Sequence, residues 1–128
     1  MRLVRRWGLP LLWAVVIFAL SHAPQPGGSL PSPGLDKAAH SVLFAVLAPL
    51  VLRALLQGKT PTVQSAAQAI LLSAIYGALD EVHQRFVPTR QCSLNDWLAD
   101  VAGAVAGVLA LVLLQRRRSE QPPSARRE

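Results

Sequence analysis

The chain has 128 residues and a mass of 13.8 kDa, which is enough for one domain. Hydrophobic residues make up 52% of the sequence and charged residues only 16%, and the apolar residues are clustered into blocks. A water-soluble helical bundle needs polar faces that recur every 3.6 residues, and residues 102–114 have none. This composition excludes an ordinary soluble bundle and predicts an integral membrane protein.

The formal net charge is +6, from 13 Lys and Arg residues against 7 Asp and Glu residues. Most of the basic residues flank apolar blocks, so we interpret the charge as a signal of membrane topology and as attraction to anionic lipids. We therefore expect no nucleic-acid partner. The single cysteine, Cys92, has no partner for an internal disulfide or for a Cys-based metal site.

The first apolar block predicts a helix over about residues 7–23. Arginines precede it and Ser21-His22-Ala23 is similar to a cleavage site, so a signal peptide is the alternative interpretation. Pro24 would hinder cleavage, and Trp7 and Trp13 suit an interfacial anchor. We therefore favour a retained helix.

Three further apolar blocks predict helices over about residues 38–56, 63–82 and 97–114, each close to the length that spans a bilayer. Residues 24–34 are rich in Pro and Gly and predict an irregular external loop, while residues 57–61 predict a short inner turn. The expected fold is all-α, an integral membrane bundle of four transmembrane helices.

The basic residues are distributed unevenly between the two ends of these helices. With the N-terminus inside, ten of them lie on the cytoplasmic side: Arg2, Arg5, Arg6, Arg53, Lys59, Arg116, Arg117, Arg118, Arg126 and Arg127. Three lie outside: Lys37, Arg85 and Arg90. The positive-inside rule then places both termini in the cytoplasm. We expect a transmembrane domain over residues 1–114 and a disordered basic tail over 115–128, in the bacterial cytoplasmic (inner) membrane, with the lipid bilayer as the first partner.

Every acidic residue before the tail falls at the opposite, extracytoplasmic side. Three segments bring polar residues there: Asp36, Lys37 and His40; Asp80, Glu81, His83 and Gln84; and Arg90, Asp96 and Asp100. Charged groups cost about 2.5–3.5 kcal/mol each at the centre of a membrane helix and are usually functional. The sequence therefore predicts one shared polar site.

Helical spacing predicts which of these side chains share a face. Asp80 shares a face with His83 and Gln84, while Glu81 is turned by roughly 100° and is expected to face elsewhere. Asp36 and His40 are four residues apart and also share a face.

Asp100 is expected to lie about one helical turn below the surface, where it needs a partner. Arg90 is the first candidate for that partner and Lys37 the second. The stripe that contains Asp96 and Asp100 continues into a seam of small residues that lets another helix approach closely, within the bundle or between copies. The seam consists of Ala99, Gly103 and Gly107.

Over residues 36–107 the chain resembles the VanZ-like family of small bacterial multi-pass membrane proteins. The motifs that carry the resemblance are Asp36-Lys-x-x-His40, Asp80-Glu-x-His-Gln84, Phe86-x-Pro-x-Arg90 and Ser93-x-x-Asp96-x-x-x-Asp100-x-x-Gly103. The family commonly has Asn where this chain has Asp100. Its namesake is associated with resistance to the glycopeptide antibiotic teicoplanin, through an activity that is not established. The resemblance implies a cell-envelope protein and does not extend to a role in resistance.

The charges of the predicted site permit two interpretations. With neutral histidines, five carboxylates against three cations leave a charge of −2, which suits a divalent metal held by His40, His83 and Asp80. A metal-activated water would then attack a lipid-linked envelope precursor, or Asp80, Glu81 or His83 would act as acid or base. With both histidines protonated the charges cancel, and the residues would only fasten the helices together.

Three classes of function follow from these interpretations. We favour a non-catalytic envelope protein that binds or shields a lipid-linked or cell-wall component at the polar pocket. Its ligand-binding candidates are Asp36, Lys37, His40, Gln84, Arg90, Asp96 and Asp100. The alternatives are a small membrane enzyme, a hydrolase or group transferase with or without a metal, and a transporter subunit. Transport is the weakest of the three because the polar residues do not continue across the membrane.

Overall fold

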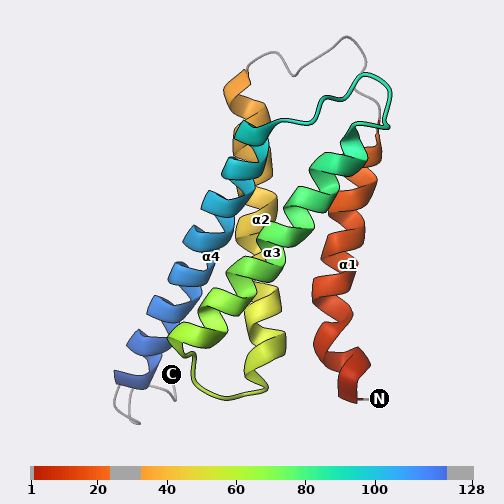
Figure 1. Ribbon diagram of the computed structural model, residues 1–128. Coiled ribbons are helices and arrows are strands. Elements are labelled where there is room, and N and C mark those ends of the chain that lie inside the picture. Colours follow the sequence, from red (N-terminus) through yellow and green to blue (C-terminus); the bar gives the residue numbers. More distant parts are fainter. Residues whose placement is uncertain (1, 24–32, 121–128) are drawn as a thin grey trace, which may run out of the picture.

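In the part of the chain that the structure describes, four helices are arranged in up-and-down order (Figure 1). The computed structural model describes residues 2–23 and 33–120, and this part of the chain contains helices and no strand. The helices are α1 (Arg2–His22), α2 (Pro33–Leu56), α3 (Val63–Gln84) and α4 (Leu94–Glu120). The all-α class predicted from the sequence is confirmed.

The helices are longer than the apolar blocks that predicted them. Pro33 and Gly34 belong to α2 rather than to the preceding loop, since Pro is tolerated in a first helical turn that needs no N–H donor. At the other end of the chain, α4 continues to Glu120, beyond its predicted end at residue 114, so the first part of the predicted disordered tail is helical. The rest of that tail, residues 121–128, and residues 24–32 of the predicted loop lie outside the described residues.

The turn between α2 and α3 has clear local determinants. Gln57 and Gly58 have positive φ angles of 53° and 86°, which end α2 in a left-handed conformation. A capping box then starts α3: Thr62 Oγ1 accepts a hydrogen bond from the Ser65 amide, and Ser65 Oγ accepts one from the Thr62 amide. This short turn places α2 and α3 antiparallel.

The two ends of the bundle differ in charge, and we name them accordingly. At the polar end α1 and α3 finish and α2 and α4 begin, so the acidic segments meet there (Figure 1). The basic end is the opposite one, where α1 begins, α2 turns into α3 and α4 finishes. Its basic residues are Arg5, Arg6, Arg53, Lys59, Arg116, Arg117 and Arg118.

The apolar core is centred on α2, which contacts all three other helices. Phe44, Ala48 and Leu52 of α2 are completely buried and pack with residues of every neighbouring helix. Those neighbours include Ile17, Ala69, Ala104 and Val108. Within the described residues α1 contacts α2 and α3 but not α4, so α1 lies on one side of the bundle.

The seam of small residues on α4 packs against α2 inside the bundle. A Cβ atom at Gly103 would overlap the carbonyl oxygen of Ser41, and one at Gly107 would overlap that of Ala45. Close to this contact, Ser41 Oγ donates a 2.8 Å hydrogen bond to the carbonyl oxygen of Ala99. The α2–α4 approach therefore requires glycine at both positions.

Two helices, α2 from Gly34 to Leu56 and α4, are long and apolar enough to cross a membrane. The other two predicted spans do not meet that requirement, since α3 carries polar residues such as Gln64 and Gln68 within its apolar block. All four helices nevertheless present large apolar side chains on the surface. Examples are Leu12 and Val15 of α1, Val42 of α2, Leu72 and Ile75 of α3, and Leu113 of α4.

Candidate functional site

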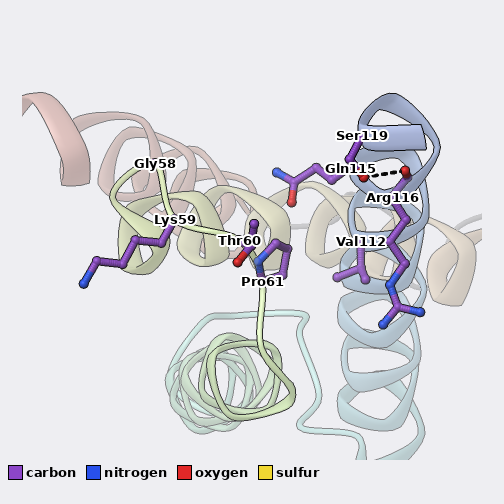
Figure 2. Close-up of a pocket in the computed structure, with 8 residues that line it drawn as sticks. All are labelled: Gly58, Lys59, Thr60, Pro61, Val112, Gln115, Arg116 and Ser119. Carbon is purple, nitrogen blue, oxygen red and sulfur yellow. Dashed lines mark hydrogen bonds between the residues drawn. The ribbon is translucent and has the colours of Figure 1, made fainter. Parts of the chain in front are cut away.

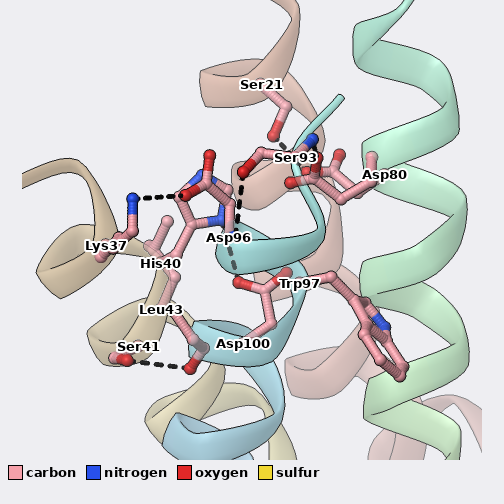
Figure 3. Close-up of polar contacts among 12 residues, drawn as sticks. Ser21, Lys37, His40, Ser41, Leu43, Asp80, Ser93, Asp96, Trp97 and Asp100 are labelled. Atoms are coloured by element: carbon pink, nitrogen blue, oxygen red, sulfur yellow. Dashed lines mark hydrogen bonds and ion pairs between the residues drawn. The ribbon is translucent and has the colours of Figure 1, made fainter. Parts of the chain in front are cut away.

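Buried polar side chains gather at the polar end of the bundle (Figure 3). Each is at most 8% exposed. We refer to these residues as the polar site: Ser21, His40, Asp80, Glu81, Gln84, Asp96 and Asp100. They come from all four helices, so the up-and-down topology creates the site.

Asp80 is held on the α1 side of this site. Its Oδ2 atom accepts a 2.6 Å hydrogen bond from Ser21 Oγ and a 3.1 Å hydrogen bond from Gln84 Nε2. Asp80 and Gln84 share a face of α3, as their spacing predicts. This arrangement ties the end of α3 to the end of α1.

His40 and Asp100 form a buried pair between α2 and α4. Nδ1 of His40 lies 2.9 Å from Oδ1 of Asp100, and Asp100 is completely buried. The prediction that Arg90 or Lys37 would pair with Asp100 was therefore wrong. His40 takes that place because the glycine contact at Gly103 brings the α2 backbone close to α4, within reach of the shorter imidazole.

Glu81 also faces the interior, contrary to the prediction that it would turn away. It is 3% exposed, and its Oε2 atom accepts a 2.7 Å hydrogen bond from the Ser93 amide just before α4. The end of α3 is packed on two sides, with α1 beside Asp80 and the start of α4 beside Glu81. Both faces of α3 are consequently buried, and a rotation of 100° does not bring Glu81 to the surface.

Arg90 contacts α1 rather than a carboxylate. Its Nη2 atom donates a 2.9 Å hydrogen bond to the carbonyl oxygen of Leu20, and its Nε atom donates one of 3.4 Å to that of Ala23. These carbonyls end α1 and have no partner within the helix. Arg90 thus anchors the loop before α4 to α1.

His83 lies apart from His40, on the α1 side of α3. Its Nε2 atom is 3.2 Å from Nδ1 of His22, and its ring packs against Phe18. The structure therefore does not bring together the predicted metal ligands His40, His83 and Asp80.

Lys37 and Asp36 occupy the rim of the polar site. Lys37 Nζ lies 3.5 Å from Oδ1 of Asp96, as a partly exposed ion pair (Figure 3). Asp96 also lies in the first turn of α4, where its backbone amide donates a 3.3 Å hydrogen bond to Ser93 Oγ. Asp36 is half-buried in the first turn of α2 and lies near His40 and Asp96.

Several carboxylate oxygens at the polar site have no hydrogen-bond partner among the described residues. They are Oδ1 of Asp80, Oε1 of Glu81, Oδ1 of Asp96 and Oδ2 of Asp100. Two groups of side chains bring possible metal-binding atoms within 4.8 Å of one another: His40 with Glu81 and Asp100, and His40 with Asp36 and Asp96. His40 is common to both groups.

A pocket of about 330 Å³ opens beside the polar site, between α1 and α2. Ile17, Leu20 and Leu43 form its apolar walls, and the loop residue Arg90 closes one side. Besides Arg90, its polar lining consists of Ser21, Asp36, His40 and Asp80. The pocket therefore combines an apolar surface with part of the polar site.

A second pocket, of about 410 Å³, lies at the basic end between the α2–α3 turn and α4 (Figure 2). Lys59 and Arg116 line it, together with Gln115 and Ser119. Among the described residues that line it there is no carboxylate. The two ends of the bundle thus present pockets of opposite character.

A protein-family model described as VanZ/LLP1 matches residues 4–115. The chain belongs to the VanZ/LLP1 family. Comparison with curated proteins and with solved structures gave no match. The VanZ/LLP1 match extends over α1, which lies outside the motifs at residues 36–107. Together with the two apolar helices α2 and α4, family membership makes the chain a membrane protein of the cell envelope.

The structure also shows contacts with α1 from residues that the motifs did not include. Ser21 bonds Asp80, and Tyr76 donates a 2.6 Å hydrogen bond from its hydroxyl to the carbonyl oxygen of Ala14. Ser21 lies four residues after the buried Ile17, and this helical spacing was the available signal that Ser21 faces the bundle. The sequence around Ser21 was instead considered as a possible cleavage site.

Proposed function

We propose that this VanZ/LLP1 protein spans the bacterial cytoplasmic membrane four times and binds a lipid-linked cell-wall component at its polar end, on the extracytoplasmic side. The exposed apolar side chains of α1 and α3 support four spans, since these surfaces need lipid to cover them. The basic end carries most of the Lys and Arg residues, which supports a cytoplasmic location for both termini.

The observation that carries the proposal is the pocket between α1 and α2. A binding pocket for a small molecule is typically apolar, with a few convergent polar groups that fix orientation. Here Ile17, Leu20 and Leu43 supply the apolar walls, while Asp80 and Arg90 supply polar groups. Because the pocket lies near the ends of the helices, it would meet the headgroup and the first carbons of a membrane-embedded lipid.

The polar lining suits a sugar-phosphate headgroup. Carboxylates such as Asp36 and Asp80 accept hydrogen bonds from sugar hydroxyls, and the Arg90 guanidinium is suited to a phosphate. Lys37 adds a second cation at the rim. Lipid-linked cell-wall precursors join a sugar to a long apolar chain through phosphate, so their chemistry matches both parts of the pocket.

Ala39 provides the test, because it lines the pocket and is itself exposed. Ala39→Trp fills the space without removing a buried side chain, whereas the adjacent Ala38 is exposed and does not line the pocket. Native mass spectrometry of the detergent-purified protein would measure binding of a polyprenyl phosphate sugar, with the free polyprenol for comparison. We expect Ala39→Trp to weaken binding at least about tenfold, equal to about 1.4 kcal/mol, and Ala38→Trp to bind like the wild type.

Two results would contradict the proposal. One is binding of the polyprenyl phosphate sugar that Ala39→Trp leaves unchanged. The other is equal binding of the free polyprenol, which would mean that the polar lining does not recognise a headgroup. A cytoplasmic reporter fused to the C-terminus, if it appeared outside the cell, would overturn the orientation.

A second candidate function, hydrolysis or group transfer on the same lipid, is favoured by the His40–Asp100 pair. A carboxylate that bonds one imidazole nitrogen orients the ring and prepares the other nitrogen to act as a base. His40 lines the pocket, so the second nitrogen would be near a bound headgroup. Release of phosphate or sugar from the bound polyprenyl phosphate sugar, lost in His40→Gln, would establish this activity.

A further inference from the structure

The buried carboxylates of the polar site are not balanced by nearby cations. They are Asp80, Glu81, Asp96 and Asp100. Among the described residues, Lys37 pairs with one of them and His40 with another, while Arg90 donates to the carbonyl oxygens of α1. Even with His40 protonated, Asp80 and Glu81 are left without a cationic partner among the described residues, although both accept hydrogen bonds. Burying an uncompensated charge is costly, so this arrangement favours binding of a cation.

Three of the side chains are arranged as a possible coordination site. His40 of α2, Glu81 of α3 and Asp100 of α4 are all buried, and each offers a ligand atom within 4.8 Å of the others. Oε1 of Glu81 and Oδ2 of Asp100 have no hydrogen-bond partner among the described residues. These unpartnered atoms distinguish the site from a network of carboxylates that is already satisfied.

We propose that His40, Glu81 and Asp100 bind one divalent transition-metal ion, Zn²⁺ or Mn²⁺, between α2, α3 and α4. One imidazole and two carboxylates make a mixed nitrogen and oxygen set that these ions accept, whereas Mg²⁺ and Ca²⁺ prefer oxygen alone. Ligand atoms at about 2.1 Å from a tetrahedral ion lie roughly 3.4 Å apart. The candidate ligand atoms, all within 4.8 Å of one another, are close to this spacing.

The rival set, His40 with Asp36 and Asp96, is less suited to the metal. Asp96 already pairs with Lys37, whose charge would repel a cation, and Asp36 is only half-buried. The two sets share His40, so a variant of His40 does not distinguish them. Variants of Glu81 and Asp36 do.

The metal site does not depend on the proposed lipid binding, although His40 also lines the lipid pocket. An ion at His40 would lie beside a bound headgroup and could contact its phosphate. The two proposals are nevertheless measured separately, since metal binding is assayed without lipid and lipid binding is assayed with a chelator in excess.

Isothermal titration of the full chain, purified in detergent and stripped with EDTA, tests the site with Zn²⁺ and with Mn²⁺. We expect one ion per chain and a higher midpoint of thermal unfolding when the ion is present. Glu81→Gln keeps an oxygen that accepts from the Ser93 amide, so the fold should persist. This variant should bind the ion at least about 100-fold more weakly, since loss of an outer partner alone costs roughly 10- to 100-fold.

Asp36→Asn and His83→Gln are the matched controls and should bind the ion like the wild type. Circular dichroism and the elution volume from size exclusion verify that Glu81→Gln is folded. The proposal is overturned if the wild type binds neither ion, if folded Glu81→Gln binds as tightly as the wild type, or if Asp36→Asn loses binding. The last of these results would assign the metal to the rival set.

Discussion

The interior of the bundle is equally well buried toward its two ends but differs in chemistry. Toward the basic end the buried residues are mainly Leu, Val and Ala, and Leu52 is completely inaccessible. Toward the polar end the buried residues are mainly carboxylates, and Asp100 is also completely inaccessible. Both are held between α2 and α4, so the difference arises from the side chains and not from their depth.

This difference separates the part of the molecule that stabilises the fold from the part that is adapted to bind. Burial of an apolar side chain contributes roughly 1.5–3 kcal/mol, whereas a buried carboxylate without a full set of partners lowers stability. Local rules of folding are typically broken at functional sites, and the rest of the structure compensates. We therefore expect variants toward the basic end to reduce stability and variants at the polar site to reduce binding.

Gly103→Ala should have the largest effect on stability. It pushes α2 away from α4, and that contact holds residues both at the polar end and toward the basic end. A Cβ at this position overlaps the backbone carbonyl of Ser41, which cannot rotate away. We expect a loss of about 3 kcal/mol, the upper end of the usual overpacking cost, in the free energy of unfolding, measured by SDS titration in mixed micelles. Gly8→Ala is the matched control, since a Cβ there has no neighbour within 4 Å. It should be neutral or slightly stabilising. Equal effects of the two changes would contradict the close α2–α4 contact.

Leu52→Ala should lower stability by disrupting the apolar core toward the basic end, without changing the polar site. Removal of a completely buried leucine leaves a cavity and costs about 3 kcal/mol, measured by the same titration. Leu113→Ala removes the same atoms from a side chain that is 56% exposed and should have a smaller effect. Folded Leu52→Ala should still bind the proposed metal ion with unchanged affinity. A loss of metal binding in this variant would mean that packing of the apolar core affects the geometry of the polar site.

The sequence was sufficient to predict where the polar residues meet. Apolar blocks joined by short turns must alternate in direction, so residues at the end of one helix and the start of the next come to the same end of the bundle. This reasoning placed His40, Asp80 and Asp100 together without knowledge of their contacts. The α4 seam could be recognised for the same reason, from the regular spacing of Gly103 and Gly107.

The pairs within the site could not be predicted, because they depend on the rotation and the separation of whole helices. Spacing along α3 fixes the angle between Asp80 and Glu81 but does not show that both sides of α3 are covered. Arg90 was chosen as the partner of Asp100 from charge alone, yet the carbonyl oxygens that end α1 are within its reach. The role of α1 was missed as well, since Ser21 lies outside the motifs.

Asp80→Asn should affect the polar site alone. In contrast to Leu52→Ala, it should remove binding without lowering stability. The Asn side-chain oxygen can still accept from Ser21 and Gln84, while the charge is removed and the new amide can occupy the place of the unpartnered Oδ1 atom. We expect stability to stay the same or to rise by roughly 1 kcal/mol, while binding of the polyprenyl phosphate sugar is lost.

Asp80→Ala separates the effect of the charge from that of the hydrogen bonds. It removes the acceptor and leaves Ser21 and Gln84 without their partner, so it should lower stability by about 1–3 kcal/mol. If Asp80→Asn is as unstable as Asp80→Ala, then the negative charge itself stabilises the fold. The polar site would in that case stabilise the fold, as the apolar core does. A carboxylate that is retained for binding should instead be replaceable without loss of stability.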